Sequence, residues 1–237
     1  MIPMFFFSRK TTLAESGFFP RHIDYHSHIL PGVDDGAPDI TKTGAMLKVL
    51  GELGVKELWF TPHVMEDMPN KPSELKALFA DVSNKGIGHG IKLHLASENM
   101  LDSLFRQRLR DNELIPIIDD RHLLIETSYF NAPMGLSEII NDIKDHGYVP
   151  VLAHPERFSY MGMTDYVSLK RAGVMFQLNY LSLLGAYGHS VAQKAVDILD
   201  KGMYNITGSD IHSLEGFMSY VHVPIKSKIM EKLNSLH

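Results

Sequence analysis

The sequence contains no cysteine in its 237 residues. Disulfide bonds, thiolate zinc sites and every mechanism with a cysteine nucleophile are therefore excluded. Positive charge is also scarce, because 23 Lys and Arg stand against 28 Asp and Glu, which gives a formal net charge of -5. Basic runs do not exceed a pair such as Arg9-Lys10. This charge pattern lacks the electrostatic footprint of a nucleic-acid-binding protein, so we expect no DNA or RNA partner.

Long hydrophobic runs are absent as well. The apolar opening at residues 4–7 is far shorter than a signal-peptide core or a membrane span, and no small-residue cleavage site follows it. We therefore expect a cytoplasmic protein that does not insert into a membrane. The hydrophobic and charged fractions, 44% and 22%, are those of a globular protein. We expect one domain over residues 1–237, with an irregular lead-in over residues 1–20.

Short apolar runs bounded by turn residues predict about seven strands. They lie near residues 22–29, 56–61, 91–97, 122–127, 149–153, 174–179 and 204–208. Helical patterns separate them, as in residues 41–53 and 190–201, and a closing helix is expected over 218–237. This alternation predicts an α/β fold with a parallel sheet, either an open doubly wound sheet or a closed barrel. No glycine-rich dinucleotide fingerprint follows the first strand, which disfavours a Rossmann fold.

The first predicted strand carries Asp24, His26 and His28 at alternating positions. Alternate residues of a strand point to the same face, so the two imidazoles can reach one metal ion. An isolated pair of this kind is equally compatible with a solvated strand face.

The other predicted strands also tend to end on residues that bind metals. These residues are His63, Glu98, Glu126, His154, Asp210 and His212. In a parallel barrel all strand ends of one kind lie on the same face, so the side chains would converge there. Singly, Glu126 could cap a loop and His63 could be a turn histidine. Together they favour a site where divalent cations compensate for buried carboxylates.

With Asp35, the candidate ligands number five histidines and four carboxylates, which is too many for one tetrahedral zinc ion. They are His26, His28, Asp35, His63, Glu98, Glu126, His154, Asp210 and His212. We therefore expect two or three ions. Nitrogen and oxygen ligands without sulfur suit Mn, Fe, Zn, Co or Mg. Paired ions about 3.5 to 4 Å apart commonly promote attack at phosphorus.

These residues resemble the motifs of the PHP (polymerase and histidinol phosphatase) superfamily. The runs HILPGVDDG at 28–36 and AHPERF at 153–158 are similar to the CpsB-like branch, the bacterial capsule and exopolysaccharide tyrosine phosphatases. The resemblance extends over residues 22–216. It implies a PHP fold, which is a distorted (β/α)7 TIM-like barrel, and a trinuclear site that manganese typically activates.

The resemblance also implies roles for individual residues. One ion would be held by His26, His28, Glu98 and Asp210, a second by Glu98, Glu126 and His154, and a third by Asp35, His63 and His212. Asp24 would not bind an ion itself but would contact the residues that do. Arg157 would bind a phosphate oxygen and act in catalysis with Asp210 and His212, unless it pairs with Glu156 or a loop carboxylate instead.

The activity implied is that of a phosphoric monoester hydrolase acting on phosphotyrosine. Its substrate would be the tyrosine-rich tail of a membrane-bound bacterial autokinase that controls polysaccharide export. Because the chain has no cysteine, a phosphocysteine intermediate is impossible, and metal-activated water would attack phosphorus directly.

One position departs from the pattern of that branch. The capsule phosphatases carry an arginine shortly after the Asp-x-His motif, whereas Phe217 stands here. Either the role of that arginine is lost, or Arg106 or Arg108 supplies it, or Phe217 packs against the substrate ring.

Other functions remain in competition. A small-molecule phosphomonoesterase of the histidinol-phosphatase type would use the same ligands. A catalytically silent domain that binds polymerase or kinase partners would be expected to have lost some of them. A proofreading exonuclease is opposed by the negative charge.

Overall fold

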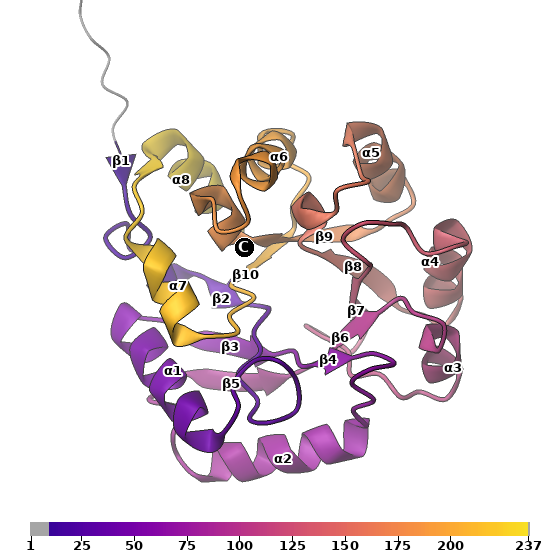
Figure 1. Cartoon of the computed structure of the whole chain (residues 1–237), viewed down its shortest axis with the longest axis horizontal. Coiled ribbons are helices and arrows are strands. Elements are labelled where there is room, and N and C mark those ends of the chain that lie inside the picture. Colours follow the sequence, from indigo (N-terminus) through magenta and orange to yellow (C-terminus); the bar gives the residue numbers. More distant parts are fainter. Residues whose placement is uncertain (1–9, 237) are drawn as a thin grey trace, which may run out of the picture.

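Parallel strands form the centre of the fold and helices surround them (Figure 1). The computed structural model describes residues 10–236, so the apolar stretch at residues 4–7 lies outside the described residues. A six-stranded sheet has the order β10-β9-β8-β7-β6-β4, and a three-stranded sheet has the order β2-β3-β5. The strands are β2 (Ile23–Asp24), β3 (Glu57–Phe60), β4 (His63–Val64), β5 (Lys92–Leu95), β6 (Glu98–Met100), β7 (His122–Glu126), β8 (Val149–Ala153), β9 (Met175–Asn179) and β10 (Ile206–Gly208).

The two sheets meet where strands bend. The chain passes from β3 to β4 through Pro62, which has no N–H to donate, and a similar break separates β5 from β6. At the opposite edges of the two sheets, Tyr25 N, just after β2, donates to Thr207 O in β10 at 3.1 Å. A further parallel bridge joins Ser27 to Ile211. The result is an α/β fold whose parallel sheet is strongly curved.

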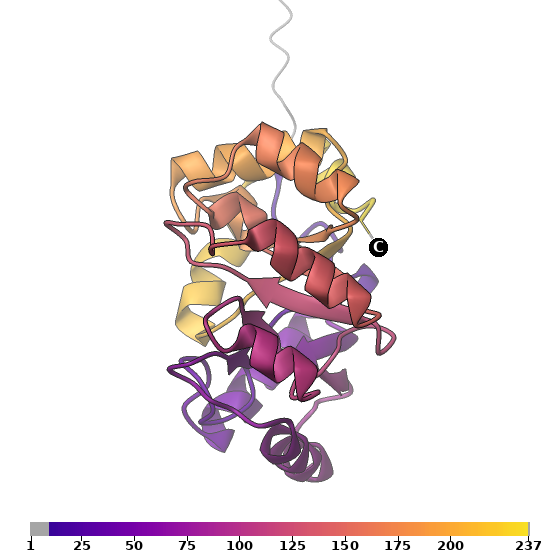
Figure 2. The same ribbon diagram turned by 90° about the vertical axis from the view of Figure 1, so that its right-hand side faces the viewer.

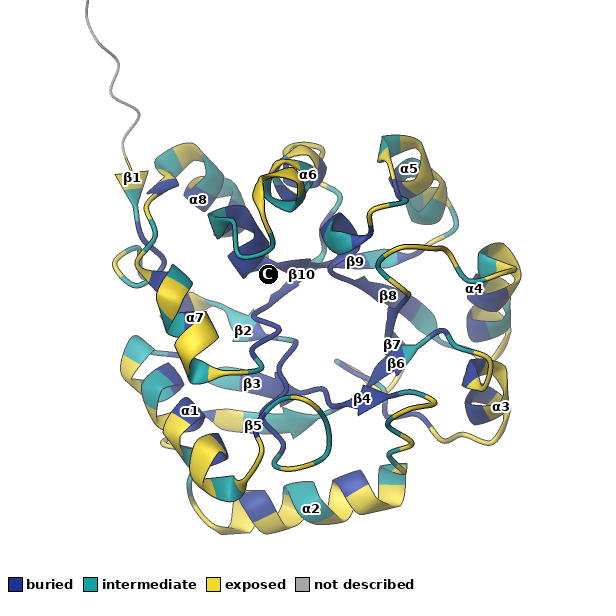
Figure 3. Cartoon of the chain, viewed as in Figure 1, coloured by how far each residue is buried: buried dark blue, intermediate teal, exposed yellow. Residues whose placement is uncertain are grey.

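Eight helices of the described chain lie outside the strands. They are α1 (Ile40–Leu53), α2 (Pro72–Asn84), α3 (Phe105–Arg110), α4 (Leu136–Asp145), α5 (Met163–Arg171), α6 (His189–Asp200), α7 (Leu214–Val221) and α8 (Ser227–Leu233). Their buried residues face the strands and their exposed residues face outward (Figure 3). The view turned by 90° shows helices lying across the outside of the sheet (Figure 2). Within residues 10–236, no helix is both long and apolar enough to cross a membrane.

Local sequence explains the first long helix. Asp39 caps α1 by accepting a hydrogen bond from Lys42 N at 2.9 Å, and Gly54 ends it in the left-handed conformation with φ 97°. Leu47 and Leu50 are completely buried on its inner face. The helix predicted at residues 41–53 is therefore confirmed.

The ends of the chain differ from expectation. Within the lead-in that was expected to be irregular, β1 (Lys10–Thr11) pairs antiparallel with β11 (Ile225–Lys226). The single closing helix predicted over residues 218–237 is wrong. Two helices, α7 and α8, stand there instead, because Pro224 cannot continue a helix and the chain becomes extended at β11.

A small apolar cluster lies on the same strand faces as the candidate ligands. It contains Trp59, Ala96, Ile117, Leu124, Val151, Ala153 and Ile206. Leu124 precedes Glu126 by two residues on β7, so both side chains point to one face. The larger core, between strands and helices, takes the alternate residues such as Leu123 and Ile125. The apolar cluster thus forms the floor beneath the polar strand ends.

Candidate metal centre

The structure brings all nine predicted ligands together. Their ligand atoms form three groups, each within 4.8 Å: His28, Asp35, His63 and His212; His26, Glu98, His154 and Asp210; and His63, Glu98 and Glu126. Most of these side chains are buried, and only Asp35 is exposed.

The deepest contacts surround His26 and His28. Their Nε2 atoms lie 3.1 Å apart. Glu98 Oε2 lies 3.1 Å from His26 Nε2 and 3.3 Å from His28 Nε2. Asp210 Oδ1 lies 3.4 Å and 3.3 Å from the same two nitrogens. Four ligand atoms therefore face a common point.

The other carboxylate oxygen of Glu98 belongs to a second group of possible ligands. Glu98 Oε1 lies 3.1 Å from His154 Nε2, which in turn lies 3.9 Å from Glu126 Oε2. In a third set, nearer the surface, Asp35 Oδ1 lies 3.5 Å from His63 Nε2 and 3.3 Å from His212 Nε2. These contacts are compatible with the three ligand sets that the resemblance implied, but the groups of neighbouring ligand atoms divide the residues differently. His154 is grouped with His26, and His63 Nδ1 lies 3.2 Å from both Glu98 Oε2 and Glu126 Oε1. The assignment of ions to ligand sets stays a prediction.

The donor atoms fit divalent cations. Ligands about 2.0 to 2.2 Å from an ion stand about 3.0 to 3.5 Å from one another, which is the spacing seen here. Glu98 Oε2 and His63 Nδ1 lie 3.2 Å apart, and both are buried without a well-aligned hydrogen bond among the described residues. Leaving such atoms unpaired is costly, and a bound cation would remove that cost.

Partners on the far side of the rings fix the histidine tautomers. His26 Nδ1 donates to Gln177 Oε1 at 2.9 Å, and His28 Nδ1 donates to Asp34 Oδ2 at 2.8 Å. His212 Nδ1 donates to the carbonyl oxygen of Asp210 at 2.9 Å. Each Nε2 then faces the carboxylates and is the ring nitrogen available to a metal ion.

Sequence reasoning did not identify Asp34 or Gln177 as site residues. Asp34 stands next to the predicted ligand Asp35, and their opposite roles depend on a loop conformation that residue types do not reveal. The sequence did contain a pattern that could have identified Gln177 as a site residue. With Asn179 it alternates along the one predicted strand that ends without a candidate ligand.

Asp24 is not among the grouped ligand atoms, and its role in supporting the ligands stays a prediction. It accepts hydrogen bonds from His26 N at 3.2 Å, Ser209 N at 2.8 Å and Tyr180 Oη at 3.3 Å. Burial raises the pKa of Asp24 to about 6, although these hydrogen bonds oppose the shift. The carboxyl therefore ties the His26 strand to the segment that carries Asp210.

Unusual backbone geometry also shapes the centre. His154 and Asp210 adopt positive φ angles of 31° and 54°, which non-glycine residues rarely do outside constrained sites. Gly208 is required because a Cβ there would lie 2.4 Å from His26 Cβ, and at Gly36 a Cβ would lie 2.0 Å from His28 O. These contacts hold neighbouring strand ends close together.

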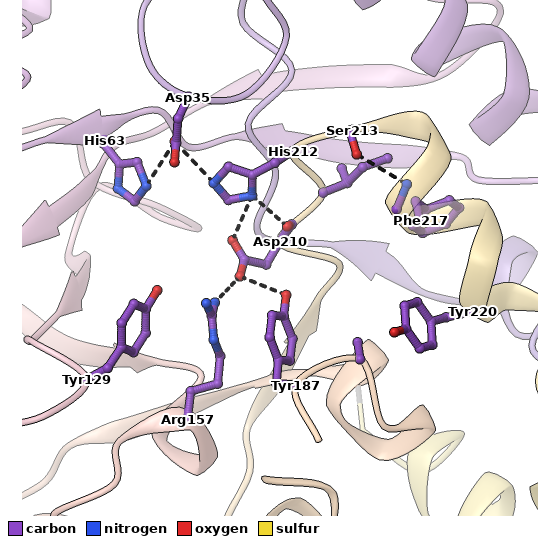
Figure 4. A pocket seen from close by; sticks show the side chains of 13 residues that line it. Asp35, His63, Tyr129, Arg157, Tyr187, Asp210, His212, Ser213, Phe217 and Tyr220 are labelled. Carbon is purple, nitrogen blue, oxygen red and sulfur yellow. Dashed lines mark hydrogen bonds and ion pairs between the residues drawn. The ribbon is translucent and has the colours of Figure 1, made fainter. Parts of the chain in front are cut away.

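A pocket of about 500 Å³ opens above the ligands (Figure 4). It is lined by Asp35, His63, Tyr129, Arg157, Ala186, Tyr187, Asp210, Ile211, His212, Ser213, Gly216, Phe217 and Tyr220. The Arg157 guanidinium contacts Asp210 and lies 4.5 Å from the ring centre of Tyr129 and 4.1 Å from that of Tyr187. Of the described residues, Arg157 is the only Arg or Lys in this lining. A phosphate in the pocket would meet its donors.

The alternative pairing of Arg157 with Glu156 is not seen. Glu156 points into the protein, where it accepts hydrogen bonds from Ser182 Oγ at 2.8 Å and Tyr204 Oη at 2.9 Å. The carboxylate that Arg157 contacts is instead that of Asp210, one of the candidate ligands.

Phe217 borders the pocket but is only 1% exposed and packs near Phe19. Its contact with a substrate ring stays a prediction. Arg106 pairs with Asp142 at 2.6 Å and Arg108 pairs with Asp102 at 2.6 Å. Neither lines the pocket, so neither supplies a second arginine there.

Comparison with known proteins gives a consistent result. Residues 22–222 match the profile of a family described as capsular polysaccharide synthesis, CpsB/CapC. The chain is 26% identical over 197 residues to the putative tyrosine-protein phosphatase CapC of Staphylococcus aureus, covering 81% of this chain and 77% of that one. It is 26% identical over 223 residues to the tyrosine-protein phosphatase CpsB of Streptococcus pneumoniae, covering 84% and 86%.

A similar solved structure comes from work on YwqE from Bacillus subtilis and CpsB from Streptococcus pneumoniae, described as unique metal-dependent tyrosine phosphatases. The TM-score is 0.76 at 25% sequence identity, over 89% of this chain and 85% of that chain.

Proposed function

Because the chain belongs to the CpsB/CapC family of capsular polysaccharide synthesis, we propose that it is a metal-dependent protein-tyrosine phosphatase. The observation that carries this proposal is the convergence of nine nitrogen and oxygen ligands beneath a pocket that contains Arg157. The relatives named as tyrosine-protein phosphatases support the substrate class.

The proposal includes a closed, distorted (β/α)7 barrel of the PHP type, formed by residues 1–237 as one domain. The hydrogen bond from Tyr25 to Thr207 and the bridge between Ser27 and Ile211 support closure. They connect the segment that follows β2, in the small sheet, to β10 and the segment after it, at the edge of the large sheet.

Two or three divalent ions would be held by the three ligand sets, with manganese foremost and iron, zinc, cobalt or magnesium as alternatives. Bound ions would supply Lewis-acid chemistry, activating water as the nucleophile and neutralising phosphate oxygens. Asp210 and His212 would act in catalysis as metal ligands that also line the pocket where substrate binds.

Arg157 has the role of orienting the phosphate. Its fork of N–H donors matches two phosphate oxygens, and the rings of Tyr129 and Tyr187 keep the guanidinium in place. Asp35 and His212 are 59% and 31% exposed, so substrate approaches from their side.

A small-molecule phosphomonoesterase is the second candidate. Phe217 favours it, because this residue replaces the arginine that the resemblance leads us to expect near the substrate. A catalytically silent regulatory domain is disfavoured by the retention of all nine ligands in a converging arrangement.

The physiological substrate that we propose is the phosphotyrosine tail of a membrane-bound bacterial tyrosine autokinase, whose dephosphorylation would regulate capsule or exopolysaccharide export. The family description supports the process. A cytoplasmic location stays a prediction.

A substrate panel tests the function. Manganese-loaded protein should hydrolyse phosphotyrosine peptides with a higher kcat/KM than histidinol phosphate or other small phosphomonoesters. His26→Ala should abolish the activity on every substrate. Efficient turnover of small phosphomonoesters without hydrolysis of phosphotyrosine peptides would favour the second candidate.

A further inference from the structure

A second cavity adjoins the pocket above the metal centre. Its volume is about 530 Å³, and three of its lining residues, Asp35, His212 and Ser213, also line the first pocket. The two cavities therefore adjoin each other beside the exposed ligands Asp35 and His212.

The walls of the second cavity come from the start of α1, the loop before it and the start of α7. The apolar part consists of Ala37, Pro38, Ala45, Met46 and Leu214. Three charged side chains complete the lining: Asp35, which is one of the candidate metal ligands, Lys42 on α1 and Glu215 on α7. No described residue forms an ion pair with the Lys42 ammonium. An unpaired cation thus faces space that a ligand can enter.

A second cavity beside the first pocket gives a bound peptide room beyond the phosphotyrosine side chain. An extended peptide advances about 3.3 Å per residue, so a residue about three positions from the phosphotyrosine can reach an adjoining cavity. Among residues 10–236, Arg157 and Lys42 are the only Arg or Lys residues that line the two cavities. They offer separate cationic positions, one for the phosphate and one farther along a bound chain.

We propose that the second cavity is a subsite for an acidic side chain of the substrate polypeptide, within about three residues of the phosphotyrosine, and that Lys42 recognises it. This inference rests on the proposed function, because it presumes that phosphotyrosine occupies the first pocket. The overall charge of -5 would otherwise repel an acidic chain, which makes a local cation at this position important.

Peptide pairs test the subsite. Phosphotyrosine peptides that carry Glu, Gln or Lys at one position on either side of the tyrosine are compared by kcat/KM. At the favoured position we expect Glu to exceed Gln by about threefold to fivefold at low salt, as for a partly exposed ion pair. The ratio should fall toward one as salt is added.

Two charge reversals on the same helix separate local recognition from overall charge. Lys42→Glu should reverse the preference from Glu to Lys, and it should fold well because an acidic residue suits the first turn of α1. Lys48→Glu, which alters charge equally outside both cavities, should keep the preference for Glu. Hydrolysis of p-nitrophenyl phosphate should change no more in the first variant than in the second.

The subsite is overturned if the wild-type protein shows no preference, prefers Lys through Glu215, or keeps its preference for Glu after Lys42→Glu. The proposed function fails in a different way. In that case metal-loaded wild-type protein hydrolyses no peptide of the series, whether or not it hydrolyses p-nitrophenyl phosphate.

Discussion

At the scale of single residues, Asp210 connects the metal ligands to the phosphate-binding side of the pocket. Its Oδ1 faces His26 and His28, while its Oδ2 accepts a hydrogen bond from Asn179 Nδ2 at 3.2 Å and contacts Arg157. Movement of Arg157 toward a phosphate would change the hydrogen bonding of a ligand. Substrate binding and the metal centre are therefore linked through one carboxylate.

The contact between Asp34 and His28 should control metal affinity. Asp34→Asn weakens the acceptor for His28 Nδ1, so we expect metal affinity to fall by about tenfold to a hundredfold, as for other partners of metal-binding histidines. Calorimetric titration with Mn²⁺ measures this. Asp39→Asn, in the same loop, keeps a residue that can cap α1 and should leave the affinity unchanged. Equal affinities for both variants would contradict the prediction.

The planar fork of Arg157 should matter more than its charge. Arg157→Lys keeps the charge but loses two-point binding and the stacking between Tyr129 and Tyr187, so kcat/KM for aryl phosphates should fall at least about tenfold. Arg106→Lys is the matched control, because Arg106 pairs with Asp142 away from the pocket. Steady-state kinetics with full metal loading measures both. A similar loss in the two variants would show that the fork has no special role.

At the scale of secondary structure, replacing either of two glycines by alanine should change stability in opposite directions. Gly208→Ala forces a Cβ against His26 at the end of β10, so we expect a loss of at least about 1 to 3 kcal/mol in the free energy of unfolding. Gly44→Ala in α1 meets no atom within 4 Å and should stabilise the protein by about 0.5 to 1 kcal/mol. Urea denaturation distinguishes the two, and stabilisation by Gly208→Ala would contradict the close approach.

Most elements could be predicted from the sequence because their signals are local. Strands β7 and β8 and helix α1 follow from apolar runs, helical spacing and caps. The short strands β4 and β6 could not, because their existence depends on which neighbour each bent segment pairs with after Pro62 and Ser97. The candidate ligands could be predicted because each is near a strand end. Asp34 could not, since its contact with His28 depends on the conformation of the loop between them. Gln177 had a signal in its alternation with Asn179, but its contact with His26 joins segments 151 residues apart.

At the scale of the whole molecule, metal binding should release protons. Burial alone would lower the pKa of His26, but Glu98 and Asp210 raise it to about 9 in the metal-free protein. A divalent ion binds only the neutral imidazole, so near neutral pH the ion must displace a proton. Metal affinity should therefore increase as the pH rises toward about 9. Calorimetry in two buffers of different ionisation enthalpy counts the protons, and no net release would refute this expectation.

The ligand sets differ in their distance from solvent, and this difference has a kinetic consequence. Asp35 is 59% exposed and His212 31%, whereas Glu98 and His154 are each 1% exposed. An ion at the outer set would exchange with solution rapidly, while ions at the inner sets would have long residence times because their route outward crosses the outer position. Dialysis should therefore remove metal in two phases. The specific activity of a purified sample would depend on how long it had been washed.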